Sequence, residues 1–304
     1  MLAIVLALAS AIGYGGSDFA AGLASRSASV IRVTLLGAAA SVVAVAAALP
    51  FAASESPTPA ALAWGAAAGL GGTVGALALY LGFRHAAFSV AGPLSAVGTA
   101  GFSVLAGLLL GERPTPLALT GIILALPAIV GVSASAAADR ADGPDGPDGS
   151  EAAAAGERDP GAPPGPATGV AAGLVAGACF ALLLIGLNQA GSGSGLWPVA
   201  AAQITELAAV CVLAVVTGNL RPPGRRSGWL AVTAGVTGTA GTILYFLATH
   251  EGFLAVTAVL TSLYPAVTIV LARLMLGERL TPLRLIGLSL AAVCVALIAA
   301  GGAG

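Results

Sequence analysis

Long apolar segments follow one another along most of the chain, and short stretches rich in glycine, proline or polar residues separate them. Each segment is long enough for a helix to cross about 30 Å of hydrocarbon at a rise of about 1.5 Å per residue. We therefore predict an all-α integral membrane protein with ten transmembrane helices. The expected spans are 2–24, 30–53, 60–83, 86–110, 115–136, 168–190, 196–217, 228–249, 252–276 and 281–301.

The middle of the chain departs from this pattern. Between Asp139 and Pro166 there are six glycines, six prolines and seven acidic residues, a composition that cannot bury an apolar core. We predict a flexible linker at 139–167. It would separate a first five-helix repeat, residues 1–138, from a second, residues 168–304.

Composition and charge narrow the functional class. Hydrophobic residues make up 58% of the chain and charged residues 8%, and the mean hydropathy is +0.98. Such a chain needs the lipid bilayer as its partner, so we expect a multi-pass protein of the cell (plasma or inner) membrane. A net charge of −1 gives no reason to expect nucleic acid binding. The three cysteines lie in apolar segments without metal-ligand spacing, so we expect no metal, disulfide framework or cofactor.

One stretch occurs twice: GERPTPLALTG at 111–121 and GERLTPLRLIG at 277–287, which differ at three of eleven positions. The two halves of the chain are therefore repeats. Because five is an odd number of spans, the second repeat would enter the membrane from the opposite side. We predict two inverted five-helix repeats, a recurring transporter design with the site at the interface of the repeats.

Each copy of this stretch leaves one apolar segment and opens the next, which is typical of a helix junction. At the first copy, Gly111 would end a helix in the left-handed conformation, Thr115 would cap the next helix, and Pro116 would occupy its first turn. Glu112 and its counterpart Glu278 precede the electropositive start of that next helix. We expect both carboxylates to stabilise their junctions.

Two stretches resemble a known family. LYPAVTIVLARLMLGERLTPLRLIG, 263–287, is similar to the signature of EamA-type transporters in the drug/metabolite transporter (DMT) superfamily, and GYGGSDF, 13–19, lies where that family has its first-helix motif. The resemblance implies a ten-helix bundle, a substrate cavity lined by helices three, four, eight and nine, and efflux of metabolites or amino acids. It also implies cytoplasmic termini, whereas the distribution of arginines favours an N-terminus outside.

Ionisable groups inside spans are costly in hydrocarbon, so they are candidates for a substrate or ion pathway. Asp18 and Ser17 lie in GYGGSDF, where glycines would loosen the first helix. Asp18 would be a proton or cation site, or a partner for a cationic substrate; the alternative is an interfacial carboxylate near a helix end. Arg32 begins the second span and would pair with Asp18, or else extend to the interface.

Gln203 and Glu206 lie well inside the seventh span, one turn apart on one face of the helix. A charged carboxylate in lipid would cost several kcal/mol, so Glu206 must be paired, protonated or in contact with water. One interpretation is a cavity role, with Glu206 as a proton carrier. The other is a structural hydrogen bond between two helices.

Four tyrosines would either line a cavity and bind substrate, or serve packing and the interfacial belt. They are Tyr14, Tyr80, Tyr245 and Tyr264. Tyr264 precedes Pro265 in the ninth span, where proline removes a backbone donor and leaves a carbonyl available to a ligand. Pro93 is a nearby counterpart in the fourth span. Kinks at Pro93 and Pro265 would suit gating, although packing alone also explains them.

The sequence contains no motif for nucleophilic, phosphate-binding or metal-dependent chemistry, so we expect neither an enzyme nor an ATP-driven pump. We predict a secondary transporter that exports a small-molecule substrate by alternating access around a cavity between the repeats, with proton coupling as an option. The alternative is a membrane binding or sensor protein with the same helices and no transport. A monomer would be sufficient, and a dimer is compatible with the sequence.

Overall fold

The computed structural model describes residues 1–25, 27–52, 56–85, 88–141, 166–276 and 282–301, with only the backbone described at 79–85, 88–93, 131–141, 166–170, 276 and 283–284. Within these ranges every regular element is a helix. The helices are α1 (Leu2–Ser25), α2 (Val30–Ala48), the 3-10 helix η1 (Leu49–Phe51), α3 (Pro59–His85), α4 (Phe88–Leu109), α5 (Pro116–Ala141), α6 (Pro166–Gln189), α7 (Trp197–Val216), α8 (Arg225–Glu251), α9 (Leu254–Thr261), α10 (Tyr264–Leu276) and α11 (Pro282–Gly301).

The predicted spans are helical, with ends that differ by a few residues, and the ninth span is the exception. We predicted one helix at 252–276, but the structure divides this span into α9 and α10. Pro265 has no N–H to donate to the carbonyl of Thr261, and the N–H of Leu263 turns back to the carbonyl of Leu260 at 3.2 Å. The regular ladder of helical hydrogen bonds therefore stops between the two short helices.

Among the described residues, seven segments are long and apolar enough to cross a membrane, and three shorter apolar helices accompany them. The chain is therefore a multi-pass membrane protein. The predicted linker at 139–167 falls between α5 and α6, but α5 continues to Ala141 and α6 begins at Pro166. The rest of that linker lies outside the described residues.

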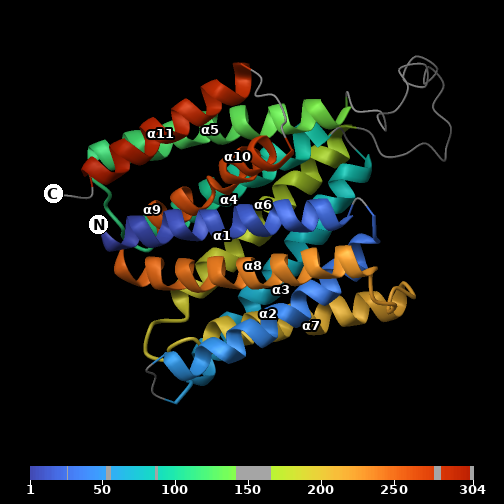
Figure 1. Cartoon of the computed structure of the whole chain (residues 1–304). Coiled ribbons are helices and arrows are strands. Elements are labelled where there is room, and N and C mark those ends of the chain that lie inside the picture. Colours follow the sequence, from blue (N-terminus) through green and yellow to red (C-terminus); the bar gives the residue numbers. More distant parts are fainter. Residues whose placement is uncertain (26, 53–55, 86–87, 142–165, 277–281, 302–304) are drawn as a thin grey trace.

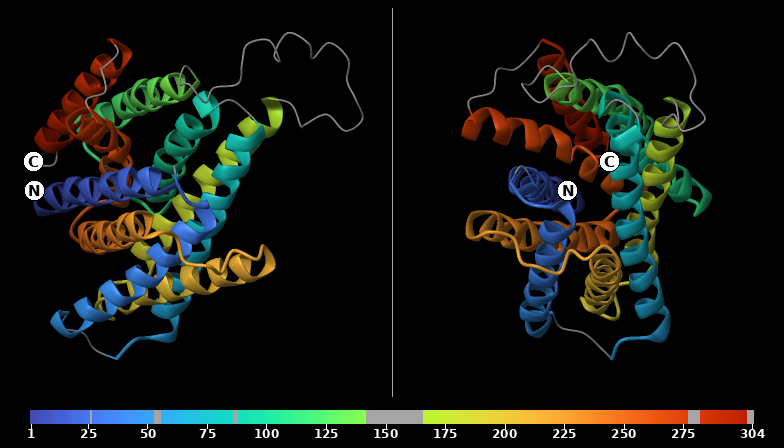
Figure 2. Two further views of the ribbon diagram at one scale, coloured as in Figure 1. Left: turned by 45° about the vertical axis from the view of Figure 1, so that its right-hand side comes forward. Right: turned by 90° about the vertical axis from the view of Figure 1, so that its right-hand side faces the viewer.

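The helices form one bundle (Figures 1 and 2). α5 pairs with α11 along one flank, α2 lies beside α7 along the opposite flank, and α1 and α8 run side by side between them. α3 packs on α6, and α4 contacts both α6 and α9. The start of α1 and the end of α11 lie at the same end of the bundle.

The helix junction at the first GER copy is built as predicted. Gly111 has φ of 91°, in the left-handed region, and the N–H of Ala118 donates to Thr115 Oγ1 at 3.3 Å as the cap of α5. The same hydroxyl donates to the carbonyl of Gly301 at 3.0 Å, so it also binds the end of α11. The corresponding residues of the second copy, 277–281, lie outside the described residues.

Glycines let helices from the two halves of the chain meet backbone to backbone. Gly65 of α3 lies against the backbone of Pro198 in α7. A Cβ added to Gly13 of α1 would come within 2.7 Å of the Cα of Gly241 in α8. Lipid is as apolar as leucine, so helices in a membrane associate through close contact rather than through burial from water. These glycines provide that contact.

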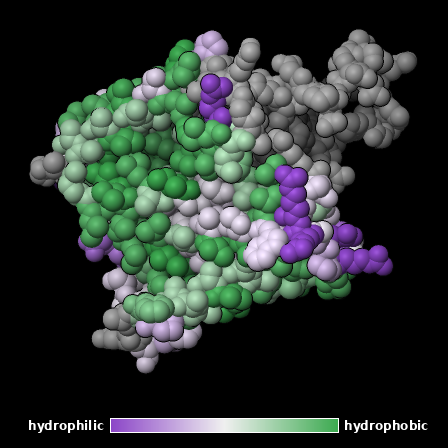
Figure 3. Space-filling view, in the orientation of Figure 1, coloured by the Kyte–Doolittle hydropathy of each residue, from purple (hydrophilic) through white to green (hydrophobic). Residues whose placement is uncertain are grey.

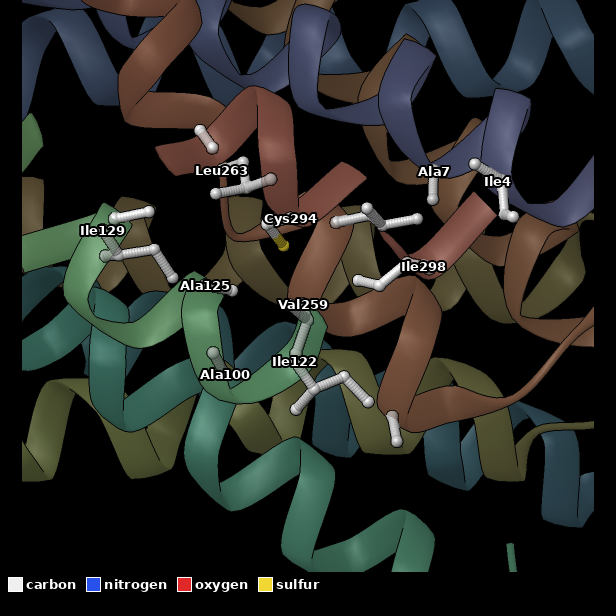
Figure 4. Packing of buried hydrophobic residues seen from close by; sticks show 14 of the residues in the cluster. Ile4, Ala7, Ala100, Ile122, Ala125, Ile129, Val259, Leu263, Cys294 and Ile298 are labelled. Atoms are coloured by element: carbon white, nitrogen blue, oxygen red, sulfur yellow. The ribbon is translucent and has the colours of Figure 1, made fainter. Parts of the chain in front are cut away.

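Apolar side chains fill the interior and cover the outside. In Figure 4, Ile122 and Ile129 of α5 lie with Cys294 and Ile298 of α11 and Val259 of α9 in one buried cluster. Figure 3 shows apolar side chains over most of the visible face, with hydrophilic groups gathered towards its margins. This is the surface expected of a bundle surrounded by hydrocarbon.

Gly65 provides a test of the backbone contact. Gly65→Ala places a methyl group on the backbone of Pro198, and overpacking of this kind costs about 1–3 kcal/mol. We expect a lower thermal unfolding midpoint for the purified variant in detergent. Gly22→Ala is the matched control, because the added methyl group would meet no other helix within 4 Å. The change favours the helix by about 0.4–1 kcal/mol. Equal midpoints for the two variants would contradict close packing at Gly65.

Candidate substrate cavity

A cavity of about 140 Å³ lies between the first and second halves of the chain. Its walls come from α1, α4, α6, α9 and α10. The lining residues are Tyr14, Asp18, Thr99, Phe180, Leu183, Leu184, Thr261, Ser262 and Tyr264. The volume suits a small metabolite, since pockets for drug-sized ligands measure about 300–1,000 Å³.

Two tyrosines form one wall of this cavity. The rings of Tyr14 and Tyr264 meet edge to face, with centroids 6.5 Å apart and an interplanar angle of 65°, an arrangement that aromatic pairs prefer. The Tyr14 hydroxyl donates to Thr242 Oγ1 at 3.0 Å, and Thr268 Oγ1 donates to the carbonyl of Gly15 at 3.2 Å. These bonds hold α1 against α8 and α10, so they position both rings.

The break in the ninth span opens onto the cavity, where Thr261 and Ser262 contribute to the lining. The carbonyl of Thr261 has lost its usual helical donor, because residue 265 is proline. Ser262 is 1% exposed, and its hydroxyl has no hydrogen-bond partner among the described residues. Irregular backbone at membrane depth is tolerated where protein or a cavity surrounds it. The break therefore leaves polar groups of Thr261 and Ser262 without helical partners in residues that line the cavity.

Asp18 is the one charged residue among the described residues that line the cavity. It follows Tyr14 by one helical turn, and Tyr14 and Tyr264 line the same cavity. A carboxylate beside two phenols can bind a cation or exchange a proton. The structure thus brings together three of the residues that we predicted for the substrate pathway.

Glu206 lies apart from this cavity and lines a second pocket of about 50 Å³ between α2, α3 and α7. The hydroxyls of Thr34 and Thr73, which also line the pocket, donate to carbonyls of their own helices. No described residue is hydrogen-bonded or ion-paired to the Glu206 carboxylate.

Two other predicted site residues join helices rather than line the cavity. Ser17 Oγ donates to the carbonyl of Ala234 at 2.8 Å and ties α1 to α8. Gln203 is 6% exposed, and its Nε2 donates to Thr239 Oγ1 at 3.1 Å. That bond between α7 and α8 is the structural alternative raised for Gln203 above.

The remaining predicted residues have varied places. Tyr245 is fully buried in α8, and its hydroxyl donates to a carbonyl of α6 at 3.1 Å. Arg32 lies in α2, and its Nε is buried with no hydrogen-bond partner in the part of the chain that the structure describes. Pro265 is the second residue of α10, just after the break. Tyr80 and Pro93 lie in α3 and α4, and their side chains are outside the described residues.

Several lining residues escaped sequence reasoning: Thr99, Phe180, Leu183, Leu184, Thr261 and Ser262. A signal was present for the last two, since small hydroxyl residues shortly before a helix-breaking proline favour an irregular segment. For Phe180 and its neighbours in α6 no such signal existed, because they belong to a uniformly apolar stretch.

The geometry accords with comparisons to known proteins. A model of the EamA-like transporter family matches residues 1–134 and 167–300. The chain belongs to the EamA-like transporter family. A solved protein, described only as a crystal structure, aligns over 95% of this chain and 96% of its own chain, with a TM-score of 0.68 and 18% sequence identity. At that identity the match shows a shared fold alone. A comparison with curated proteins gave no match.

In this EamA-like protein, the first GER junction binds the start of another helix. The Glu112 carboxylate accepts the N–H groups of Leu254 and Ala255, the first two residues of α9, and the bond to Ala255 measures 2.9 Å. We predicted that Glu112 stabilises its junction because it precedes the start of the next helix, α5; the structure shows that its carboxylate binds the start of α9. Unpaired N–H groups at any helix start attract a carboxylate, and tertiary packing brought this one within reach. Glu278 lies outside the described residues.

Loss of the Glu112 carboxylate should loosen the start of α9. In Glu112→Ala, the N–H groups of Leu254 and Ala255 lose their acceptor, and a lost helix cap costs about 0.5–2 kcal/mol. We expect faster hydrogen–deuterium exchange in peptides that cover the first turn of α9, with exchange in α5 unchanged.

The control for this experiment is Glu251→Ala, which removes an exposed carboxylate close to the same helix start. Its exchange at α9 should match that of the parent protein. Unchanged exchange at α9 in Glu112→Ala would contradict the role of Glu112 as the cap of this helix.

Proposed function

We propose that this protein is a secondary transporter that exports a small metabolite, such as an amino acid, across the cell membrane by alternating access. The proposal rests on the cavity, because both segments of the chain that match the family model contribute to its walls. α1 and α4 come from the first match, and α6, α9 and α10 come from the second. A rocking motion of one half against the other would expose such a cavity to each side in turn. The cavity lies within one chain, which supports a monomer as the sufficient unit.

We further infer that the halves are inverted five-helix repeats. Helix contacts support this inference, because they remain matched when the halves are exchanged: α1 packs on α8 as α6 packs on α3, and α2 contacts α8 as α7 contacts α3. α9 and α10 together would then correspond to α4, which makes ten spans. The start of α1 and the end of α11 lie at one end of the bundle, as an even number of crossings requires.

The broken ninth span would be the moving part. α9 and α10 meet beside the cavity, and the few residues between them can absorb large backbone changes. Glu112 holds the far end of α9. Release of that bond would let α9 tilt about Ser262 and open one side of the cavity, which gives Glu112 and Pro265 roles in gating.

We propose Glu206 as the proton carrier. Its carboxylate has no partner among the described residues, and an unpaired charge inside a span costs several kcal/mol. The acid is therefore stable there in its neutral form. Movement of α7 that admits water to the pocket would let Glu206 release its proton.

Proteoliposomes that contain only this protein test the function. We would measure uptake of labelled amino acids and related metabolites with and without an imposed proton gradient. Gradient-accelerated flux of one chemical class would support a coupled transporter, and flux independent of the gradient would support a facilitator. Binding of a substrate without flux, by protein shown to be folded, would instead favour a membrane binding or sensor protein.

Glu206→Gln tests the coupling. The amide keeps the shape of the side chain but cannot release a proton, so we expect gradient-driven flux to fall at least about tenfold and its dependence on pH to flatten. Downhill exchange of substrate should remain, because the cavity lining is intact. Glu251→Gln, at an exposed position, is the control and should leave the pH profile unchanged. A normal pH profile in Glu206→Gln would remove this residue from proton transfer.

A further inference from the structure

Printed contacts define which helix ends share one end of the bundle. A Cβ added to Gly252, between α8 and α9, would come within 2.7 Å of Ala3 at the start of α1. Glu112 binds the start of α9, and Thr115, just before α5, binds the carbonyl of Gly301 at the end of α11. The start of α1, the end of α11 and the α4–α5 and α8–α9 turns therefore lie together. We call this the terminal end.

The terminal end carries little positive charge. Asn188, at the end of α6, donates to Thr249 near the end of α8 at 2.9 Å, and the N–H of Thr58, just before α3, donates to Ser194 Oγ at 3.1 Å. The α6–α7 turn and the start of α3 thus belong to the same end. Arg113, in the α4–α5 turn, is the one arginine in the sequence of these turns, and the chain has no lysine.

Arginines gather at the other end of the bundle, which we call the arginine end. Eight lie there, in helices or turns whose backbone the structure describes: Arg32, Arg84, Arg140, Arg221, Arg225, Arg226, Arg273 and Arg284. A hydrogen bond of 2.8 Å between Ser27 Oγ and Ser227 Oγ packs the α1–α2 turn on the first turn of α8. Figure 3 shows hydrophilic groups where α8 begins, at the right of the view. Arg26, Arg158 and Arg279 lie outside the described residues.

This asymmetry orients the protein in its membrane. Short loops on the cytoplasmic side of membrane proteins carry the excess of basic residues, and the anionic lipids of the cytoplasmic leaflet attract them. We infer that the arginine end is a surface for anionic headgroups of the cytoplasmic leaflet, so that the start of α1 and the end of α11 lie outside the cytoplasm. The inference rests on the ten spans of the proposed function. It is opposite to the orientation that the family resemblance implies.

The chemistry of the arginine end fits headgroup phosphates. Arg221, Arg225 and Arg226 are exposed beside the first turn of α8. The planar guanidinium group donates paired hydrogen bonds to phosphate oxygens. Acidic residues between 139 and 166 follow α5 at this end, but carboxylates contribute little to orientation.

The orientation assigns a side to the gate. The contact of Glu112 with α9 belongs to the terminal end, so it would face the outside. A substrate that the protein exports would then enter the cavity from the arginine end and leave past α9.

Two cysteines at opposite ends of α7 test the orientation. Ser192, in the α6–α7 turn, and Thr217, which follows the last residue of α7, are both exposed. Each would be changed to Cys after the native cysteines have been replaced by alanine, and spheroplasts would be treated with a membrane-impermeant maleimide. We expect labelling of Ser192→Cys, and labelling of Thr217→Cys only after the membrane is permeabilised. The reverse pattern, or labelling of both in sealed spheroplasts, would overturn the orientation.

Reporter fusions provide a second measurement that leaves the chain unaltered. Alkaline phosphatase is active only outside the cytoplasm of a Gram-negative host, and green fluorescent protein exported in unfolded form does not fluoresce there. Fused to the C-terminus, the phosphatase should be active and the fluorescent protein dark. A fluorescent fusion with inactive phosphatase would overturn the orientation even if the cysteine variants fail to fold.

Arg221, Arg225 and Arg226, changed together to glutamine, test the headgroup contact. The parent protein should unfold at a midpoint a few degrees higher in phosphatidylglycerol nanodiscs than in phosphatidylcholine nanodiscs, because a ligand of the folded state stabilises it. The triple variant should lose most of that difference, whereas Arg113→Gln should retain most of it. Equal midpoints for the parent in the two lipids, or a difference that the triple variant keeps, would overturn the contact.

The outcomes distinguish this inference from the proposed function. Flux through proteoliposomes together with the reverse labelling pattern would leave transport standing and remove the orientation. The expected labelling without flux of any tested substrate would support the orientation while contradicting transport.

Discussion

Helices in hydrocarbon gain nothing from hiding apolar side chains, because the surrounding lipid is equally apolar. The bundle therefore depends on how closely its backbones can approach. Glycines serve this need where the two halves of the chain meet, at Gly65 against α7 and at Gly13 against α8. Hydroxyl side chains then add hydrogen bonds across the same contacts, as Ser17 does from α1 to α8. The high glycine content, which would weaken a soluble helical protein, is what lets this one assemble.

The same environment restricts where the chain can depart from a helix. A free carbonyl in lipid is costly, so an interrupted helix needs protein or a cavity around it. The ninth span meets this condition, because 61% of it is buried within the bundle. Its interruption, at Thr261 and Ser262, lines the candidate substrate cavity together with Tyr14 and Tyr264. Architecture and site are thus linked, since a well-enclosed span can tolerate irregular backbone beside the cavity.

Sequence reasoning predicted the features that depend on neighbouring residues. The spans follow from local hydropathy, and the left-handed turn at Gly111 with its cap at Thr115 follows from a short motif. Features that depend on distant residues were missed. Nothing near Glu112 in the sequence indicates that its carboxylate binds α9, and nothing distinguishes Phe180 from other apolar residues of α6. Asp18, Tyr14 and Tyr264 were found because polar groups are rare in spans, but their meeting in one cavity required the fold.

The backbone contacts between the halves have a mechanical consequence. Interdigitated side chains form ridges and grooves, so one helix can shift along another only after its ridges have been withdrawn. A glycine surface such as that of Gly13 against Gly241 has no Cβ to form a ridge. The hydrogen bonds from Tyr14 and Ser17 to α8 therefore fix the register of the two helices, and they would have to exchange partners before α1 could slide, in a small shear of the kind known in domain motion. Movement of one half against the other is thus opposed at this contact by a few hydrogen bonds rather than by interlocked side chains.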